Sequence, residues 1–408
     1  MAVNIGKIKD KTYVAGYFGR FKLVTSRMKN SNLKVATQCV HAGTIPDTIG
    51  GGVNSPIVTS SAFKFLDTPE SSYPRYFNTP NQKVVEDKLC ALENGEAAMV
   101  LSSGMAAIST AFMALLTPGD HVVMQDQIYG GTYFYAKSQM EKLGVSYSLV
   151  KGTKVDDFKK AIQPNSKILY FETPSNPLLS ILDIAELAQL AKDNELVSFI
   201  DNTFASPINQ NPLTLGVDLV MHSGTKYLGG HSDLCFGALI TSSSLREAIR
   251  TTAVNWGGSL DAITCYQIER SLKTLSLRVQ RQNENATFIA QQLTDHPMVS
   301  NVYYPGLEMH PGHELARSQM SGFGGMLSFE LTSPGKAIDF CKQLKLIKPA
   351  LSLGGVETII SIPSLTSHIK MSKDERLAAG VSDDLLRLSV GIEDVEDLLA
   401  DLVSALGD

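Results

Sequence analysis

Short apolar runs alternate with amphipathic segments between about residue 97 and residue 241. The runs are four to six residues long, are rich in β-branched side chains, and predict buried strands. They lie at 97–101, 121–125, 145–150, 167–172, 197–200, 217–221 and 236–241. Apolar residues at helical spacing predict helices at 82–92, 105–116, 132–143 and 184–193. This alternation predicts an α/β fold with a mainly parallel sheet that is covered on both faces.

The rhythm changes after the glycine-rich sequence NWGGS at 255–259. A long, bent helix is predicted at 261–294, and shorter elements follow it. These are strands at 325–331, 357–362 and 386–390 and helices at 336–344 and 395–406. We therefore predict a large domain at 63–258 and a smaller α+β domain at 259–408.

Residues 1–62 are predicted to form an N-terminal arm. The segment 37–63 is rich in Gly, Pro, Ser and Thr and lacks sustained periodicity, so we expect it to be extended and irregular. Because such a segment has no core of its own, we expect it to contact a neighbouring subunit. The first 30 residues carry a net charge of +6, which leaves −11 for the remainder. An extra basic arm and a transit peptide both fit this leader.

Composition excludes several classes of function. The chain has 408 residues, 43% of them hydrophobic, which is enough for two domains with substantial cores. Its net charge of −5 indicates no strong field for nucleic acid. No apolar run approaches the roughly 18–20 residues that span a membrane. The five cysteines form no CxxC pair, as expected of free thiols in a reducing compartment, and we predict a cytoplasmic protein.

The candidate chemistry lies around two predicted strand ends. The run at 197–200 leads into Asp201, and the run at 217–221 leads into a Ser-Gly-Thr-Lys sequence that ends at Lys226. Open α/β sheets bind their ligands at such strand ends. Ser223 and Thr225, with the backbone N–H groups around Gly224, can hold a phosphate beside the lysine. A lysine, a phosphate site and an acid together suit pyridoxal phosphate (PLP), although Asp and Lys are also common in ordinary loops.

Other residues allow both a functional and a structural interpretation. Gly104 follows a predicted strand and opens an apolar helix, whose N-terminus favours phosphate. Arg75 in the aromatic loop YPRYFN suits a phosphate or a solvated surface. Tyr129 can stack on a flat cofactor and move protons, or simply pack. Arg387, flanked by leucines, suits a substrate carboxylate or an internal salt bridge.

The sequence His310-Pro-Gly-His313 is the one arrangement that suggests a metal pair. Pro-Gly breaks the helix that would align the two imidazoles, so we predict no metal site.

The ordered motifs of the chain resemble those of the Cys/Met-metabolism family of PLP enzymes. This family includes cystathionine γ-lyase, cystathionine β-lyase, cystathionine γ-synthase and methionine γ-lyase. The motifs are YPRYFN, SSGMAA, YGGT, ETPSNP, DNTFASP, HSGTKYLGGH, SLGGVE and LRLSVGIED. The resemblance runs from about Thr37 to the C-terminus and implies the PLP-dependent transferase fold, aspartate aminotransferase-like and of fold type I.

The resemblance also implies a role for residues in these motifs. Lys226 would carry PLP as a Schiff base, Asp201 would hold the pyridinium nitrogen, and Tyr129 would stack on the ring. The implied phosphate ligands are Gly104, Met105, Ser223 and Thr225, with Tyr73 and Arg75 supplied by a neighbouring subunit. The family implies a homotetramer, built as a pair of such dimers.

The remaining implied contacts concern the substrate. Asn176 would lie near the phenolic oxygen of PLP, and Ser352 and Arg387 would bind the α-carboxylate of an amino-acid substrate. Tyr129 is the implied acid for a leaving thiol, and Lys226 is the implied base.

The implied activity is that of a carbon–sulfur lyase of trans-sulfuration. It would cleave cystathionine or a related substrate by β- or γ-elimination to a thiol, a 2-oxo acid and ammonia. The alternative is γ-replacement by a cystathionine γ-synthase or an O-acylhomoserine thiol-lyase. Leu351 stands where many γ-synthases and γ-lyases have a glutamate, whereas methionine lyases and cystathionine β-lyases have uncharged residues there, so the resemblance favours a carbon–sulfur lyase over a γ-synthase. Gly131 stands where methionine γ-lyases have a cysteine, which argues against methionine as the specific substrate.

Overall fold

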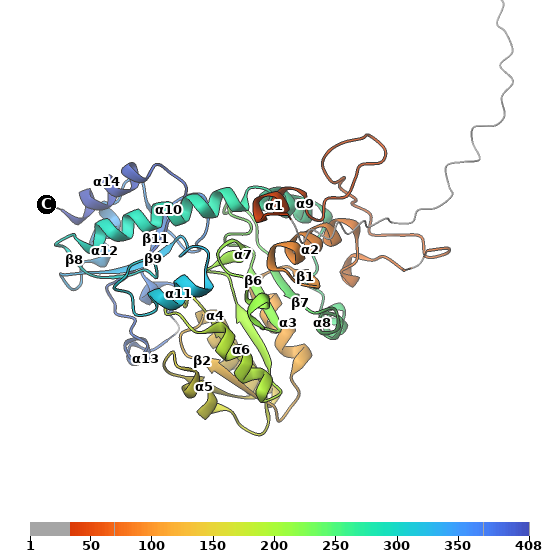
Figure 1. The fold of residues 1–408 in the computed structure, drawn as a ribbon, viewed down its shortest axis with the longest axis horizontal. Helices are drawn as coiled ribbons and strands as arrows, with labels where there is room; N and C mark the ends of the chain where they lie inside the picture. Colours follow the sequence, from red (N-terminus) through yellow and green to blue (C-terminus); the bar gives the residue numbers. More distant parts are fainter. Residues whose placement is uncertain (1–32, 69, 370, 408) are drawn as a thin grey trace, which may run out of the picture. The chain divides into compact units, whose positions relative to one another are not determined.

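The computed structural model describes residues 33–68, 70–369 and 371–407 (Figure 1). The basic leader, and with it the choice between an arm and a transit peptide, lies outside the described residues. The predicted domain boundaries after residues 62 and 258 stay predictions.

The first sheet has seven strands in the order β1-β7-β6-β5-β4-β2-β3. Their bounds are β1 Ala97–Leu101, β2 His121–Gln125, β3 Ser146–Val150, β4 Ser166–Glu172, β5 Val197–Asp201, β6 Leu219–Ser223 and β7 Gly237–Thr241. The strands from β6 to β3 pair in parallel, whereas β7 is antiparallel to both β1 and β6. The predicted mainly parallel sheet is therefore confirmed, with one reversed strand.

Helices cover both faces of this sheet. Successive strand residues point to opposite sides, so each strand contributes apolar side chains to both layers. On one face, Tyr170 and Phe199 pack against Phe112 of α3. On the other face, Ile200 packs in a core that includes Leu187 of α6. The helices of this part are α2 Pro80–Glu93, α3 Gly104–Leu115, α4 Gly130–Tyr135, α5 Val155–Ala161, α6 Ile184–Asp193, α7 Ser206–Asn209 and α8 Ser243–Trp256.

The second sheet has five strands in the order β10-β11-β12-β9-β8. Their bounds are β8 Val299–Tyr303, β9 Met326–Leu331, β10 Lys348–Pro349, β11 Ile359–Ser361 and β12 Leu385–Ser389. One face carries the core of this part, formed with residues of α10, α12 and α14. The helices are α9 Ala262–Leu272, α10 Leu275–Thr294, α11 His313–Gln319, α12 Ala337–Gln343, α13 Lys373–Ala378 and α14 Val395–Leu406.

Several elements differ from the sequence-based expectation. The bent helix predicted at 261–294 is two helices, α9 and α10, joined at Lys273 and Thr274. The segment 37–63, expected to be irregular, begins inside a helix, α1 Val35–His41. Buried Lys88 stabilises the end of α1, since its Nζ donates to the carbonyls of Cys39 (3.0 Å) and Val40 (3.3 Å). The pattern also missed α8, most of whose residues are polar or only partly buried.

The described part of the chain also bears on membrane helices, disulfides and metal ligands. None of its helices has the length and apolar character to cross a bilayer. All five cysteines are free. Within residues 33–68, 70–369 and 371–407, no three His, Cys, Asp or Glu side chains gather as metal ligands. The His310 Nδ1 accepts from Gly312 N, and the His313 Nδ1 lies 2.9 Å from the carbonyl oxygen of Pro305.

Substitution of Phe199 tests how much the aromatic core on one face of the first sheet contributes to the free energy of unfolding. Its ring centroid lies 5.4 Å from that of Phe112 and 5.2 Å from that of Tyr170. We expect Phe199→Ala to lower the free energy of unfolding by about 3–5 kcal/mol, since the cavity left behind adds to the lost burial. Leu149→Ala, on edge strand β3, is the control and should cost less than about 1.5 kcal/mol. Urea unfolding measures both, and equal losses would contradict this assignment of the core.

Candidate active site

The ends of β5 and β6 place the predicted acid and lysine beside each other. The two strands are parallel neighbours, and Asp201 pairs with Met221. Strand β6 ends at Ser223, and a turn follows in which Lys226 N donates to Ser223 O (3.1 Å). The Thr225 N–H donates to Phe236 O (3.2 Å), which fixes the turn against the start of β7. Lys226 therefore stands just beyond the carboxyl edge of the sheet, as the sequence predicted from the strand ends.

The Lys226 amine is largely removed from water and contacts Ser352, which lies between strands β10 and β11 of the second sheet. Its Nζ donates to Ser352 Oγ at 2.7 Å. Burial and, to a smaller extent, the positive charge of Arg387 lower the pKa of Lys226 to about 8, whereas Cys235 and Asp201 oppose this change. A lysine with this pKa is partly neutral near physiological pH, so its nitrogen can act as a nucleophile or a base.

Arg387 on β12 supplies a buried positive charge on the other side of Ser352. Its Nη1 donates to Asn176 Oδ1 (2.9 Å), and its Nη2 donates to Ser352 O (3.3 Å). Its Nε lacks a partner within the described part of the chain, where no carboxylate forms a salt bridge with this arginine. Burial lowers the pKa of Arg387 to about 10, and the nearby Tyr129 opposes this change. The guanidinium therefore has donor capacity left for an anion, and the salt-bridge interpretation has no support among these residues.

Asp201 shares its buried site with a second carboxyl group, that of Glu172 on β4. The two residues are direct partners across β4 and β5. Burial and the adjacent Asp201 raise the pKa of Glu172 well above its usual range. Burial also raises the pKa of Asp201, but hydrogen bonds from Thr203 and the charges of His222 and Lys226 oppose that rise. Because neighbouring buried carboxylates repel each other, the pair favours holding one proton, and the stronger rise in pKa at Glu172 assigns that proton to Glu172.

Glu172 also fixes the backbone of Tyr129. The Tyr129 N–H donates to Glu172 Oε1 at 2.8 Å, and the Tyr170 hydroxyl donates to the same oxygen at 3.2 Å. The Tyr129 ring is 43% exposed at the start of α4. Gly131 gives this ring its space, since a Cβ there would lie 2.4 Å from Tyr129 Cε1. A cysteine at position 131 would therefore require the ring to move.

The N-terminus of α3 lies directly against Ser223. The Ser103 Oγ caps this 12-residue helix by accepting from Ala106 N (3.0 Å). A Cβ on Gly104 would lie 2.9 Å from the Cβ and Oγ of Ser223. Glycine thus allows the first N–H groups of the helix, at Gly104 and Met105, to approach the turn that carries Thr225. Such a helix start favours a phosphate.

Tyr73 and Arg75 contact each other and α8 rather than Lys226 within the described residues. They belong to the 3-10 turn at Pro74–Tyr76 and its N-cap. The Arg75 guanidinium lies 5.9 Å from the Tyr73 ring centroid and donates through Nη1 to Val254 O. No hydrogen bond or ion pair of the described residues joins either side chain to Lys226.

Two groups near Asp201 were not singled out by the sequence analysis. Glu172 was visible only as part of ETPSNP, although its place at a strand end is the signal that could have identified it. Behind β5 and β6, buried His222 Nε2 lies against Glu93 Oε1, and Asn202 Nδ2 donates to the same oxygen (2.9 Å). Glu93 is more than 100 residues from His222, so only the fold brings them together.

Residues 36–407 match the family model described as Cys/Met metabolism PLP-dependent enzyme. This chain belongs to that family. It is 43% identical over 377 residues to a cystathionine γ-lyase of Bacillus subtilis, covering 92% of this chain and 99% of the relative. It is 45% identical over 378 residues to a cystathionine γ-synthase of Mycobacterium tuberculosis, covering 91% and 96%. A crystal structure of Lactobacillus plantarum cystathionine γ-lyase complexed with L-serine is similar, with a TM-score of 0.88 and 40% identity over 91% of this chain and 98% of that one.

The protein is therefore a PLP-dependent enzyme, and the observed residues fit this cofactor. A buried lysine with a lowered pKa, a charged buried acid and a helix N-terminus at a glycine lie around the same strand ends. The donor that Arg387 leaves free suits the carboxylate of an amino acid.

Glu172→Gln and Glu172→Leu separate the role of Glu172 as a hydrogen-bond acceptor for the Tyr129 N–H from the role of its charge. Glutamine keeps an acceptor for Tyr129 N–H and carries no charge, so we expect PLP affinity within about threefold of wild type. Leucine removes the acceptor and should weaken PLP binding by about tenfold or more. Fluorescence titration of the apoprotein with PLP measures both. If glutamine proved as harmful as leucine, the assignment of the proton to Glu172 would be wrong.

Proposed function

We propose that this enzyme cleaves a carbon–sulfur bond of cystathionine or a related sulfur amino acid. The products would be a thiol, a 2-oxo acid and ammonia. The contact between the Lys226 amine and Ser352, beside the partly unpartnered Arg387, supports this proposal most directly. It provides a base and an anion-binding group within reach of one small amino acid.

In this proposal, the residues at the strand ends hold PLP. Lys226 is the attachment point, Asp201 pairs with the ring nitrogen, and the Tyr129 ring stacks on the cofactor. The phosphate is bound by Gly104, Met105, Ser223 and Thr225, and Asn176 lies near the phenolic oxygen. PLP, when bound, supplies an electron sink that stabilises negative charge at the substrate Cα.

The protein residues bind the substrate and move its protons. Arg387 and Ser352 hold the α-carboxylate, which orients the Cα–H bond toward Lys226. The Lys226 nitrogen, with a pKa lowered to about 8, takes the Cα proton and, for γ-elimination, a Cβ proton as well. The Tyr129 hydroxyl gives a proton to the departing sulfur.

A second candidate function is γ-replacement, in which a thiol displaces the acyl group of an activated homoserine. The 45% identity to the Mycobacterium tuberculosis cystathionine γ-synthase favours it. The uncharged Leu351, 70% exposed beside Ser352, favours the lyase, because many γ-synthases have a glutamate at this position whereas methionine lyases and cystathionine β-lyases have an uncharged residue. A 43% identical Lactococcus lactis relative is a cystathionine β-lyase, so β- and γ-elimination both remain within the proposal.

The proposed functional unit is a homodimer, paired into a tetramer. Within the described residues, Tyr73 and Arg75 form no hydrogen bond or ion pair with Lys226 of their own chain, which agrees with phosphate contacts in a neighbouring subunit. Ile49 and Val53 in the arm, and Phe65 just after it, are exposed apolar side chains that such a neighbour would cover. The free cysteines agree with a cytoplasmic location.

Lys226→Ala is expected to leave less than about 0.1% of wild-type turnover, because the base and the attachment point are lost together. The purified variant should also lack the yellow colour of the wild type. Lys348→Ala, at an exposed position of β10, is the matched control and should keep both properties. Formation of 2-oxo acid and the absorption spectrum measure the effect; undiminished turnover by Lys226→Ala would refute the assignment.

Product identification distinguishes the proposed reactions. The wild type is incubated separately with cystathionine, with methionine, and with O-succinylhomoserine plus cysteine. Pyruvate with homocysteine would indicate β-cleavage, 2-oxobutyrate would indicate γ-cleavage, and newly formed cystathionine would indicate γ-replacement. We expect a 2-oxo acid, and the absence of product from every mixture would contradict a role in sulfur amino-acid chemistry.

A further inference from the structure

A short turn carries Tyr73 and Arg75, the two residues proposed to reach the phosphate of a neighbouring subunit. It is the 3-10 turn Pro74–Tyr76, with Tyr73 as its N-cap. Tyr73 is 43% exposed, and the Arg75 side chain is exposed as well. Beneath them the chain enters the core at Phe77, which is fully buried and has a positive φ of 55°. A bulky residue in this left-handed region is uncommon, so neighbouring groups must hold the turn in its conformation.

Helix α8 provides several of these groups, at a spacing of four residues. Arg246 Nη2 donates to Phe77 O (3.3 Å), and Arg250 Nη1 donates to Tyr76 O (3.3 Å). One helical turn further, the carbonyl oxygen of Val254 accepts from the guanidinium that the turn itself carries. Residues four apart lie on one face of a helix, so a single face of α8 supports the whole turn.

Helix α2 and the residue after Phe77 hold the other end of the turn. Gln82 Nε2 donates to Pro74 O (2.9 Å) and to Leu260 O (2.8 Å). The Tyr73 N–H donates to Asn78 Oδ1 (3.0 Å). The backbone of the turn is therefore fixed by side chains of its own chain, independently of any second chain.

The Arg75 guanidinium is also held in place, while most of its donors stay available. It lies 5.9 Å from the ring centroid of Tyr73 and 5.5 Å from that of Tyr76. The bond to Val254 O is its one hydrogen bond among the described residues. Because a guanidinium has several N–H donors and can bind a phosphate through two parallel hydrogen bonds, Arg75 is oriented for an anion from outside its own chain.

Of the two arginines on α8, Arg250 supports the turn without supporting the core. Its Nε donates to the exposed Glu247 (3.1 Å). Arg246, in contrast, also donates to Ala98 O (3.3 Å), and its Nη2 lies 3.4 Å from Oε2 of the buried Glu86. Removal of Arg246 would therefore leave a buried carboxyl group without its partner, whereas removal of Arg250 affects the turn alone.

We propose that Arg250 is a positioning residue for the cofactor phosphate of the neighbouring subunit. It holds the backbone of the turn and so fixes the direction in which Tyr73 and Arg75 leave the surface. The inference rests on the proposed function, in which these two side chains reach the phosphate bound by a second copy of this chain. Fixing them in advance lowers the conformational entropy that is lost when the two chains and PLP come together.

Substitution of Arg250 tests this role through PLP affinity. Arg250→Met removes the donor to Tyr76 O and should weaken PLP binding by the apoprotein by about fivefold or more. Arg250→Lys keeps a cationic donor and should restore most of this affinity. Fluorescence titration of the apoproteins with PLP gives each Kd, and an unchanged Kd for Arg250→Met would overturn the proposal.

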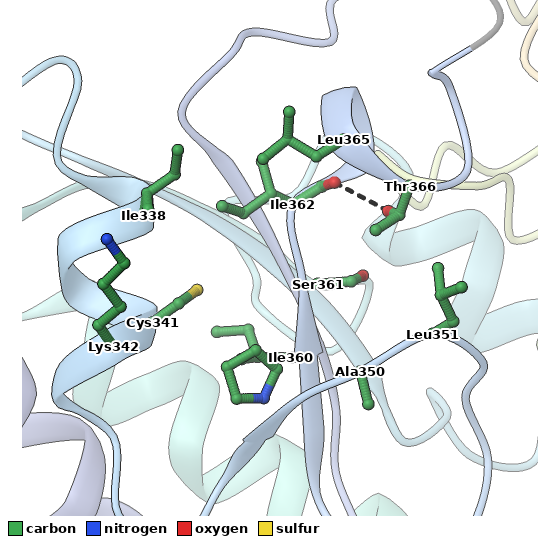
Figure 2. Close-up of a pocket in the computed structure, with 11 residues that line it drawn as sticks. Ile338, Cys341, Lys342, Ala350, Leu351, Ile360, Ser361, Ile362, Leu365 and Thr366 are labelled. Carbon is green, nitrogen blue, oxygen red and sulfur yellow. Dashed lines mark hydrogen bonds between the residues drawn. The ribbon is translucent and has the colours of Figure 1, made fainter.

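Lys342→Met is the matched control, because it also replaces a positive charge by an apolar side chain. Lys342 is exposed on α12, beside an apolar cavity at the second sheet (Figure 2). We expect the control to change the Kd for PLP by less than about twofold. A loss equal to that of Arg250→Met would show an effect of overall charge and would reject the assigned role.

A double-mutant comparison separates this role from a general effect on folding. If Arg250 acts through the turn, Arg250→Met should weaken PLP binding by less than about twofold in a chain that already carries Tyr73→Ala and Arg75→Ala. A loss as large as in the otherwise wild-type chain would mean that Arg250 acts by another route.

Hybrid dimers test whether the effect passes from one chain to the other. Chains with Arg250→Met are co-expressed with chains with Lys226→Ala, and the absorbance of PLP attached to Lys226 is followed as PLP is added. In a hybrid, Lys226 meets an intact turn supplied by the other chain, so about half of the Lys226 sites should regain wild-type affinity. If every Lys226 site keeps the weak affinity of Arg250→Met alone, the proposal is overturned.

A second mixture, with Arg75→Ala in place of Arg250→Met, distinguishes the possible failures. Restored affinity in this mixture alone would support the shared site and reject only the role of Arg250. Weak affinity in both mixtures would reject the shared site itself, and with it the inference. PLP affinity does not require turnover, so these results do not depend on carbon–sulfur cleavage, and a failure to form any 2-oxo acid would refute the proposed function alone.

Discussion

The parallel pairing of β5 with β6 is the constraint on which the site depends. It aligns the residue that ends one strand, Asp201, with the segment that leads into the Ser223–Lys226 turn. Backbone hydrogen bonds set this register, and a slip by one residue would turn Asp201 toward the opposite face. The apolar residues of the same strands resist such a slip, because Phe199 and Ile200 are buried in separate cores on the two faces. The packing of the residues just before Asp201 therefore determines the positions of the acid and the amine of the site.

Burial then gives these groups their chemical character. Lys226 and Arg387 have lowered pKa values chiefly because both are removed from water, and the charge of Arg387 lowers the pKa of Lys226 as well. Glu172 and Asp201 show the opposite case, in which two acids share one negative charge. The site thus holds a nitrogen that can be neutral, a guanidinium with a free donor and one ionised acid. This combination suits the binding of an amino acid and the transfer of its protons.

Much of the fold could be predicted from the chain, because local pattern and burial agree there. Every strand of the parallel sheet was predicted within a few residues, and the alternation with helices gave its class. The helices α1 and α8 were missed for a physical reason, since α8 is largely polar and α1 is short. The resemblance of the ordered motifs also indicated the family, which the family model then showed.

The sequence by itself determined which residue types end each strand, and hence that an acid, a lysine and a glycine-opened helix would meet at one edge of the sheet. The tertiary structure decided which groups face them. Glu172 lies opposite Asp201, His222 lies against Glu93, and Ser361 lies opposite Arg387, through pairings between distant segments. No local periodicity encodes such pairings, because they follow from sheet order and from the packing of one sheet against another. The charge of each group depends on these neighbours, so it could not be read from the chain alone.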